Sequence, residues 1–227
     1  MSIITKKSIK FLEDLTKNNN RDWFQENKKR YEEAHQNLIE FSDKLLKRLN
    51  TVDNIETPTG KKALYRIYRD VRFSKDKSPY KTWFAGGFKR ATHQLRGGYY
   101  FHIEPTSVFA AGGFWGPNKE DLLLIRKQIQ ADPAPLRAIL ESSSFIKHFG
   151  SLGGEQLKTA PKGFEKDDPA IDLLRYKQFL VSKEISPEIL NSEKLIDEIE
   201  KSFLAMRPFF DYMSEILTTN LNGEPLK

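Results

Sequence analysis

The segment spanning residues 97–116, GGYYFHIEPTSVFAAGGFWG, constrains the fold most, because its pattern is typical of a β-hairpin. Two runs of aromatic and small residues flank Glu104-Pro105-Thr106-Ser107, and Pro suits the second position of a tight turn. Residues 63–73 and 175–183 are also rich in aromatic and β-branched side chains, which favours strands. We therefore expect an antiparallel or mixed sheet.

Helical patterns precede these strands. Residues 8–17 predict a short amphipathic helix. Asn20 is a favourable N-cap, and apolar side chains then recur at helical spacing, which predicts one long helix over residues 21–50. The polar, proline-containing run SKDKSPYK (residues 74–81) predicts a loop.

Helices also follow the strands. Asn118, with Asp121 three residues later, predicts the start of a helix that runs to about residue 130, and Asp132-Pro133 starts another. Ser186-Pro187 opens a helical C-terminal part, in which Arg207-Pro208 is expected to end one helix before a last one at about residues 209–220. The order of elements predicts an α+β fold, with residues 1–227 forming a single domain.

Composition excludes several classes of protein. Hydrophobic residues make up 38% of the 227 residues and aromatic residues 12%, which is sufficient for a folded core. Cysteine is absent, so disulfides, thiolate metal sites and cysteine nucleophiles are excluded. No apolar run approaches the roughly 18 residues that span a bilayer, and no signal peptide is recognisable. We expect a cytoplasmic protein with no membrane contact.

Positive charge is concentrated in one part of the chain. Residues 61–90 contain ten Lys and Arg but only two Asp, whereas the remaining sequence has 27 basic and 29 acidic residues. Such a local excess favours anionic partners, such as phosphorylated molecules, nucleic acids or acidic protein surfaces.

The basic stretch RIYRDVRFSKDKSPYK (residues 66–81) is the first candidate site. If residues 64–73 form a strand, Arg69 lies on its apolar face, where a charge must find a carboxylate or carbonyl groups. Arg66 and Arg72 then flank Asp70 on the other face, and arginine suits bidentate binding of phosphate or carboxylate. A solvated surface with internal ion pairs is the alternative. The predicted ligand-binding residues are Arg66, Arg69, Arg72, Lys75, Lys77, Lys81, Tyr68, Tyr100 and Trp115.

His102 and Glu104 form a second candidate, because alternate residues of a strand point to the same face and Tyr100 lies beside them. Such a pair can transfer protons or simply share a hydrogen bond on the sheet. Asp70, His102 and Glu104 are the candidate catalytic residues if the protein is an enzyme. The sequence contains no recognisable set of metal ligands, identifies no cofactor, and lacks the P-loop, Gly-x-Ser-x-Gly and His-Glu-x-x-His motifs.

Several segments together resemble the domain-of-unknown-function family 2461, which consists of conserved hypothetical proteins of bacteria and fungi. The most specific is RIYRDVRFSKDKSPYKTWF (residues 66–84), and the resemblance extends over about residues 8–220. It implies no activity, cofactor or catalytic residue, but indicates that the arginine-rich stretch belongs to a shared pattern. The other matching segments are FLEDLTKNNNRDWFQENKKRYE (11–32), GYYFHIEP (98–105), GGFWGP (112–117), APKGF (160–164) and DLLRYKQF (172–179).

Three functional hypotheses follow from the sequence. The first is a binding site for a phosphorylated or otherwise anionic small molecule on residues 66–81. The second is nucleic-acid binding through the same basic region, with aromatic side chains stacking on bases. The third is a protein-interaction module without catalytic activity, in which the basic stretch is an internal folding network.

Overall fold

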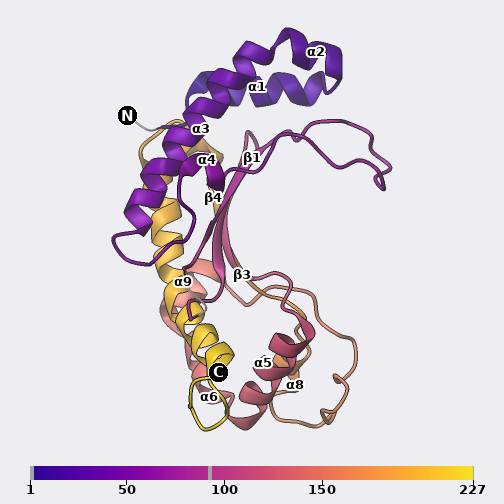
Figure 1. Cartoon of the computed structure of the whole chain (residues 1–227), viewed down its shortest axis with the longest axis vertical. Coiled ribbons are helices and arrows are strands. Elements are labelled where there is room, and N and C mark those ends of the chain that lie inside the picture. The colour runs from indigo at the N-terminus through magenta and orange to yellow at the C-terminus, as the bar shows by residue number, and fades with distance from the viewer. Residues whose placement is uncertain (1–2, 92–93, 227) are drawn as a thin grey trace. The chain divides into compact units, whose positions relative to one another are not determined.

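The computed structural model describes residues 3–91 and 94–226. Nine α-helices, one 3₁₀ helix and four strands occur in this part of the chain, and the strands form one antiparallel sheet in the order β1-β2-β3-β4 (Figure 1). The predicted α+β fold class is confirmed. Among the described helices, none is long and apolar enough to cross a membrane.

The chain divides into two compact units, which we describe separately. The first comprises the chain up to Phe88 together with Tyr100–Ala110 and Glu184–Lys201. The second comprises Lys89–Tyr99, Ala111–Lys183 and the chain from Ser202 onward. The expectation that residues 1–227 form a single domain stays a prediction.

Four helices begin the first unit: α1 (Lys6–Lys17), α2 (Arg21–Glu26), α3 (Lys28–Leu49) and α4 (Gly60–Ala63). Asn20 caps α2 as predicted, because its side chain accepts a hydrogen bond from the Trp23 amide at 2.9 Å. The prediction of one continuous helix over residues 21–50 was wrong, because Asn27 interrupts it. The Asn27 side chain donates to the Trp23 carbonyl at 2.9 Å, and this local bond competes with regular helix geometry.

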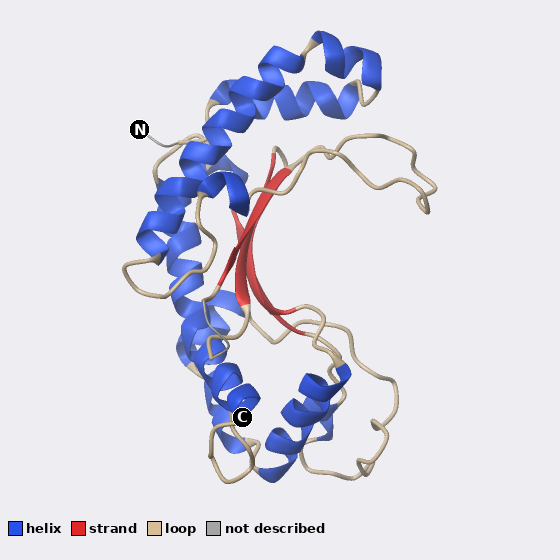
Figure 2. Cartoon of the chain, in the orientation of Figure 1, coloured by secondary structure: helices blue, strands red, loops and turns tan. Residues whose placement is uncertain are grey.

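The predicted strand over residues 63–73 was also wrong. Ala63 ends α4, and residues 64–83 form a long loop, drawn in tan between α4 and the sheet in Figure 2. In the described chain this loop forms isolated bridges instead of a ladder: Leu64 pairs with Gly86 of the sheet, and Tyr68 pairs with Tyr80 inside the loop itself. The strand propensity of residues 63–73 was not enough to form a strand, because a strand also needs a continuous ladder of hydrogen-bonded partners. The unpredicted strand β1 (Phe84–Lys89) follows instead.

The hairpin was predicted correctly. Strands β2 (Gly98–Glu104) and β3 (Ser107–Phe114) flank a turn at residues 105–106. On one face of β2, Phe101 is fully buried, and its ring lies 5.8 Å from that of Phe41 in α3 and 6.0 Å from that of Phe88 in β1. Gly86 allows this packing, since a Cβ atom there would lie 2.6 Å from the Phe101 ring. The opposite face of β2 is therefore available for polar side chains.

The later elements include the helices predicted at Asn118 and after Asp132-Pro133. The predicted strand at 175–183 is observed over Phe179–Ile185. The elements are α5 (Lys119–Ala131), α6 (Ala134–Leu140), α7 (Ser143–Phe149), α8 (Ile171–Leu174), β4 (Phe179–Ile185), the 3₁₀ helix η1 (Pro187–Ile189) and α9 (Lys194–Thr218).

Helix α9 does not end at Arg207-Pro208 as predicted, because Pro208 lies inside it. Proline in a helix costs about 3 kcal/mol, but burial of one large apolar side chain contributes about 1.5–3 kcal/mol. Phe209, Phe210 and Met213 follow Pro208 and are fully buried. Their burial outweighs the cost of the proline, and the helix continues.

Arg90 is a buried charge within the second unit. It is 1% exposed, and its guanidinium donates to the Asp211 carboxylate at 2.6 Å and to the Arg96 carbonyl at 3.2 Å. The guanidinium carbon also lies 5.6 Å from the centre of the Phe210 ring. A charge in such a position must stay paired, because its desolvation is otherwise uncompensated.

We predict that Asp211→Asn lowers the free energy of unfolding by about 2–4 kcal/mol, because it removes a carboxylate to which the buried Arg90 guanidinium donates. Asp197→Asn is the matched control: Asp197 lies in the same helix and pairs with Arg48, but Arg48 is 31% exposed and keeps Glu200. Chemical denaturation should show that the control loses less than about 1 kcal/mol of its free energy of unfolding. Equal losses in both variants would contradict this account of Arg90.

Candidate functional site

The basic loop, defined here as residues 66–81, is ordered by its own ion pairs. The Arg69 guanidinium pairs with the Asp76 carboxylate and donates to the Ser78 carbonyl at 3.2 Å. Asp76 also accepts hydrogen bonds from the Ser78 amide at 2.9 Å and the Ser78 hydroxyl at 2.7 Å. These bonds from Ser78, followed by the one from Arg69, hold the pKa of the Asp76 carboxyl far below its usual range. The prediction that Arg69 finds a carboxylate and a carbonyl is confirmed, although the residue does not lie on a strand.

Arg72 and Asp70 form the second ion pair of the basic loop. The Arg72 Nε and Nη2 atoms donate to the Asp70 carboxylate at 3.0 and 2.7 Å. This side-chain pairing lowers the pKa of Asp70. A paired carboxylate with a lowered pKa is a poor proton acceptor, so the geometry favours His102 and Glu104 over Asp70 for proton transfer.

The other four cations of the basic loop form no ion pair with a carboxylate in the described chain, although the charge of Arg66 contributes to the lowered pKa of Asp70. Lys77 donates to the Val71 carbonyl at 2.9 Å, and Lys81 donates to the Arg66 carbonyl at 2.8 Å. The side chains of Arg66 and Lys75 are exposed, and no hydrogen bond or ion pair joins them to another described side chain. The loop thus keeps a net charge of +4 from six basic and two acidic residues.

Tyr68 and Trp115, two of the aromatic residues predicted to bind the ligand, belong to different units of the chain. The Tyr68 ring lies 5.5 Å from that of Tyr80 and 6.4 Å from that of Phe24, so it fastens the basic loop to α2. Trp115 belongs to the second unit, where it is 74% exposed. It is therefore not one of the residues that the first unit brings together.

A group of rings on the face of β2 opposite Phe101 meets the end of the basic loop. Lys81 enters this group, because its Nζ atom lies 4.8 Å from the centre of the Trp83 ring and 5.8 Å from that of Tyr65. Cation–π contact of this kind stabilises an ammonium that has lost part of its water. We call the group the aromatic cluster; it consists of Tyr65, Lys81, Trp83, Tyr100, His102, Glu104 and Phe109.

His102 lies at the centre of the aromatic cluster. Its imidazole stacks on Phe109 with ring centres 4.7 Å apart, and Trp83 lies 4.9 Å away. The Tyr100 hydroxyl is 3.1 Å from His102 Nδ1, and a Glu104 carboxylate oxygen is 3.7 Å from His102 Nε2. The structure therefore places Tyr100, His102 and Glu104 together, as the alternation along the strand predicted.

Burial controls the ionisation of this cluster. It lowers the pKa of His102, against the opposing effects of Glu104 and Glu184, so the imidazole is neutral at pH 7. Burial, with a smaller effect of Tyr65, raises the pKa of Tyr100 to about 12. Burial, and then the nearby charge of Arg66, lowers the pKa of Lys81.

Sequence reasoning missed Tyr65, Trp83 and Phe109. Phe109 could have been found, because a two-residue turn after Glu104 places it opposite His102 on the neighbouring strand. Trp83 and Tyr65 could not, since their positions depend on β1 and on a loop that was predicted as a strand. No group of three or more His, Asp or Glu side chains in the described residues is placed to hold a metal ion.

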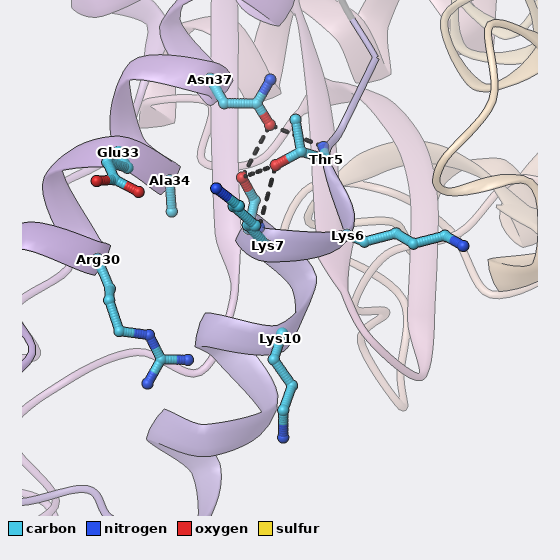
Figure 3. A pocket seen from close by; sticks show the side chains of 9 residues that line it. Thr5, Lys6, Lys7, Lys10, Arg30, Glu33, Ala34 and Asn37 are labelled. Atoms are coloured by element: carbon cyan, nitrogen blue, oxygen red, sulfur yellow. Dashed lines mark hydrogen bonds between the residues drawn. The ribbon is translucent and has the colours of Figure 1, made fainter.

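A groove of about 660 Å³ lies elsewhere in the first unit, between the start of α1 and α3 (Figure 3). Asn37 Oδ1 accepts hydrogen bonds there from the Thr5 amide at 2.9 Å and the Ser8 hydroxyl at 2.8 Å. Lys6 and Lys10 line the groove but point away from Asn37. These bonds join the start of α1 to α3, next to the Thr5 side chain that caps α1 by accepting from the Ser8 amide, so the groove has a structural explanation.

We predict that Asp76→Ala loosens the basic loop while the core stays folded, because the Ser78 amide and hydroxyl lose their acceptor and Arg69 loses its carboxylate partner. Hydrogen–deuterium exchange should show faster exchange of the Ser78 amide and unchanged exchange in β2. Lys75→Ala changes the charge of the same loop without removing a described bond and should leave exchange at Ser78 unaltered. Unchanged Ser78 exchange in Asp76→Ala would show that other contacts order the loop.

Comparison with known proteins places these features in a family. Neither the curated proteins nor the solved structures include a match to the chain. The family model described as "Conserved hypothetical protein (DUF2461)" matches residues 7–212, which include the whole basic loop and the aromatic cluster. The chain therefore belongs to the DUF2461 family of conserved hypothetical proteins.

Proposed function

We propose that this protein binds a phosphorylated or other anionic small molecule at the basic loop, beside the aromatic cluster. The observation that carries the proposal is the four cations of the basic loop that form no ion pair with a carboxylate of the described residues. They are Arg66, Lys75, Lys77 and Lys81.

Internal ion pairing accounts for only part of this charge. Asp70 and Asp76 neutralise Arg72 and Arg69, and in doing so they give the loop a defined conformation. A loop that serves only as a folding network would need no further cations. The remaining charges are consistent with an external anion as their partner.

Lys81 and Arg66 form the most favourable pair for such an anion. Burial lowers the Lys81 pKa most, and the repulsion between the two cations adds to this lowering. An anion bound between them removes the repulsion and compensates the lost water. The guanidinium of Arg66 can bind a phosphate or carboxylate through two parallel hydrogen bonds.

We predict that Arg66→Gln combined with Lys81→Met abolishes anion binding without unfolding the protein. Each lost charge-assisted hydrogen bond costs about 1.5–3 kcal/mol, so the pair should weaken binding at least about a hundredfold. Calorimetry with inorganic phosphate, polyphosphate, nucleotides and sugar phosphates would identify the ligand class in the unmodified protein and then measure the loss.

Lys28→Gln combined with Lys29→Met is the matched control, because it also removes two positive charges, but from exposed positions in α3. Binding to the control should equal that of the unmodified protein. If both double variants bind alike, the attraction is a general effect of net charge and the proposed site is wrong.

Exposed aromatic side chains on the basic loop support a second candidate, binding of single-stranded nucleic acid. Phe73 is 96% exposed and lies 5.9 Å from the Arg72 guanidinium, while Tyr68 is 54% exposed. Cations and exposed rings on one segment are the combination that holds phosphates and stacks bases.

For this candidate, we predict that Phe73→Ala weakens binding of a short single-stranded oligonucleotide by about 1–3 kcal/mol, because a stacking surface is lost. Leu221→Ala, at an exposed apolar position of the other unit, should have no effect. Affinity should also fall steeply with salt, by a logarithmic slope of about 0.7 for each phosphate contacted. A flat salt response would contradict nucleic-acid binding.

A further inference from the structure

Three side chains on one face of β2 form a connected series. Tyr100, His102 and Glu104 occupy every second position of β2, so the strand directs them to the same side. The Tyr100 hydroxyl lies 3.1 Å from His102 Nδ1, and His102 Nε2 lies 3.7 Å from Glu104 Oε2. The other Glu104 oxygen accepts a hydrogen bond from the Thr82 hydroxyl at 3.2 Å, which fixes the carboxylate.

The charges around His102 determine where its proton lies. An ionised Glu104 repels an unprotonated Nε2, so a neutral His102 carries its proton on Nε2. Nδ1 is then an acceptor, and the Tyr100 hydroxyl donates to it. This leaves the lone pairs of the Tyr100 oxygen free to accept a further proton.

We propose that Tyr100, His102 and Glu104 act as a proton relay that removes a proton from a hydroxyl group of the bound ligand. The ligand O–H bond breaks as its proton moves to the Tyr100 oxygen, and the Tyr100 proton moves to His102 Nδ1. The ligand oxygen becomes negative and His102 becomes positive. Tyr100 is the catalytic residue, His102 the base behind it, and Glu104 a positioning residue that stabilises the imidazolium.

The relay rests on the proposed function, because its ligand is the anion held at the basic loop. Tyr65 connects the two regions: its ring centre lies 6.0 Å from that of Tyr100 and 5.8 Å from Lys81 Nζ. Tyr65 is 50% exposed, so this side of the aromatic cluster is open to solvent. An anion held at Arg66 and Lys81 thus lies across the Tyr65 ring from Tyr100, and the substrate class is an anionic molecule whose hydroxyl group reaches past Tyr65 to the Tyr100 hydroxyl.

The surroundings of His102 suit a base more than a surface hydrogen bond. Phe109 and Trp83 flank the imidazole and exclude water from it, and the His102 side chain is only 10% exposed. The ionisable groups that face it are Tyr100 and Glu104 on β2 and Glu184 at the end of β4. Both carboxylates favour the imidazolium that forms when the relay operates.

An activated phenol can be tested without knowing the natural ligand. A benzenesulfonyl fluoride reacts with tyrosine as the phenol oxygen bonds to sulfur, the S–F bond breaks and the phenol proton passes to a base. Peptide mass spectrometry on the full chain gives a labelling rate for each tyrosine. We expect Tyr100 to react at least about tenfold faster than the more exposed Tyr68, and His102→Asn to remove this difference.

The pH dependence separates a relay from a structural hydrogen bond. Because the neutral imidazole is required, the Tyr100 rate should rise as pH rises through the lowered pKa of His102 and then level off. Glu104→Gln keeps the side-chain shape and the acceptor for Thr82 but removes the charge that raises the pKa of His102. The rise should therefore move to lower pH, with a lower plateau.

Two results would overturn the relay: Tyr100 labelling no faster than Tyr68, or a pH profile unchanged in Glu104→Gln. The pH profile of Glu104→Gln tests the relay even if the His102→Asn variant fails to fold. Phosphate binding by the unmodified protein, measured by calorimetry, distinguishes the two proposals. If phosphate binds but Tyr100 is not labelled fast, the anion site stands and the relay is wrong. If Tyr100 is labelled fast but phosphate does not bind, the anion site is wrong and the relay does not act on an anion held there.

Discussion

Successive side chains of β2 point to opposite faces of the sheet, and both the core and the candidate site of the first unit depend on this alternation. Phe101 and Ile103 are fully buried, and Phe101 packs on Phe41 of α3. The residues between and after them, His102 and Glu104, are forced to the other face. A shift of the register by one residue would bury the carboxylate and expose Phe101, so packing of the core also holds the polar pair in place.

The basic loop has no comparable core, and it relies on charge for its order. Its two carboxylates each fix one arginine, and Tyr68 fastens the loop to Phe24 and Tyr80. Exposed ion pairs contribute little free energy singly, but here they also complete hydrogen bonds of the loop backbone at Ser78. The result is a segment whose conformation is defined from within while most of its cations face outward.

The sequence predicted the features that follow from local rules. The hairpin turn, the Asn20 cap and the shared face of Tyr100, His102 and Glu104 depend on residues close together in the chain. Apart from the helix over residues 21–50, which a local bond of Asn27 interrupts, predictions failed where distant contacts decided the outcome. Burial of Phe209 and Phe210 carries α9 through Pro208. The aromatic stretch at 63–73 lacks a continuous partner strand, so its strand propensity is not realised. Trp83 and Tyr65 enter the site through the same long-range arrangement, which no local pattern indicates.

Charge balance explains how the proposed anion site and the proposed relay are compatible with each other. A free phenolate at Tyr100 would repel a bound anion, and burial already disfavours it by raising the Tyr100 pKa to about 12. A relay avoids the phenolate, because Tyr100 gains one proton as it passes another to His102. The new positive charge then lies between Glu104 and the ligand, where it attracts both. The aromatic walls strengthen these attractions by excluding water. The cations of the basic loop and the neutral His102 are therefore complementary parts of one electrostatic arrangement.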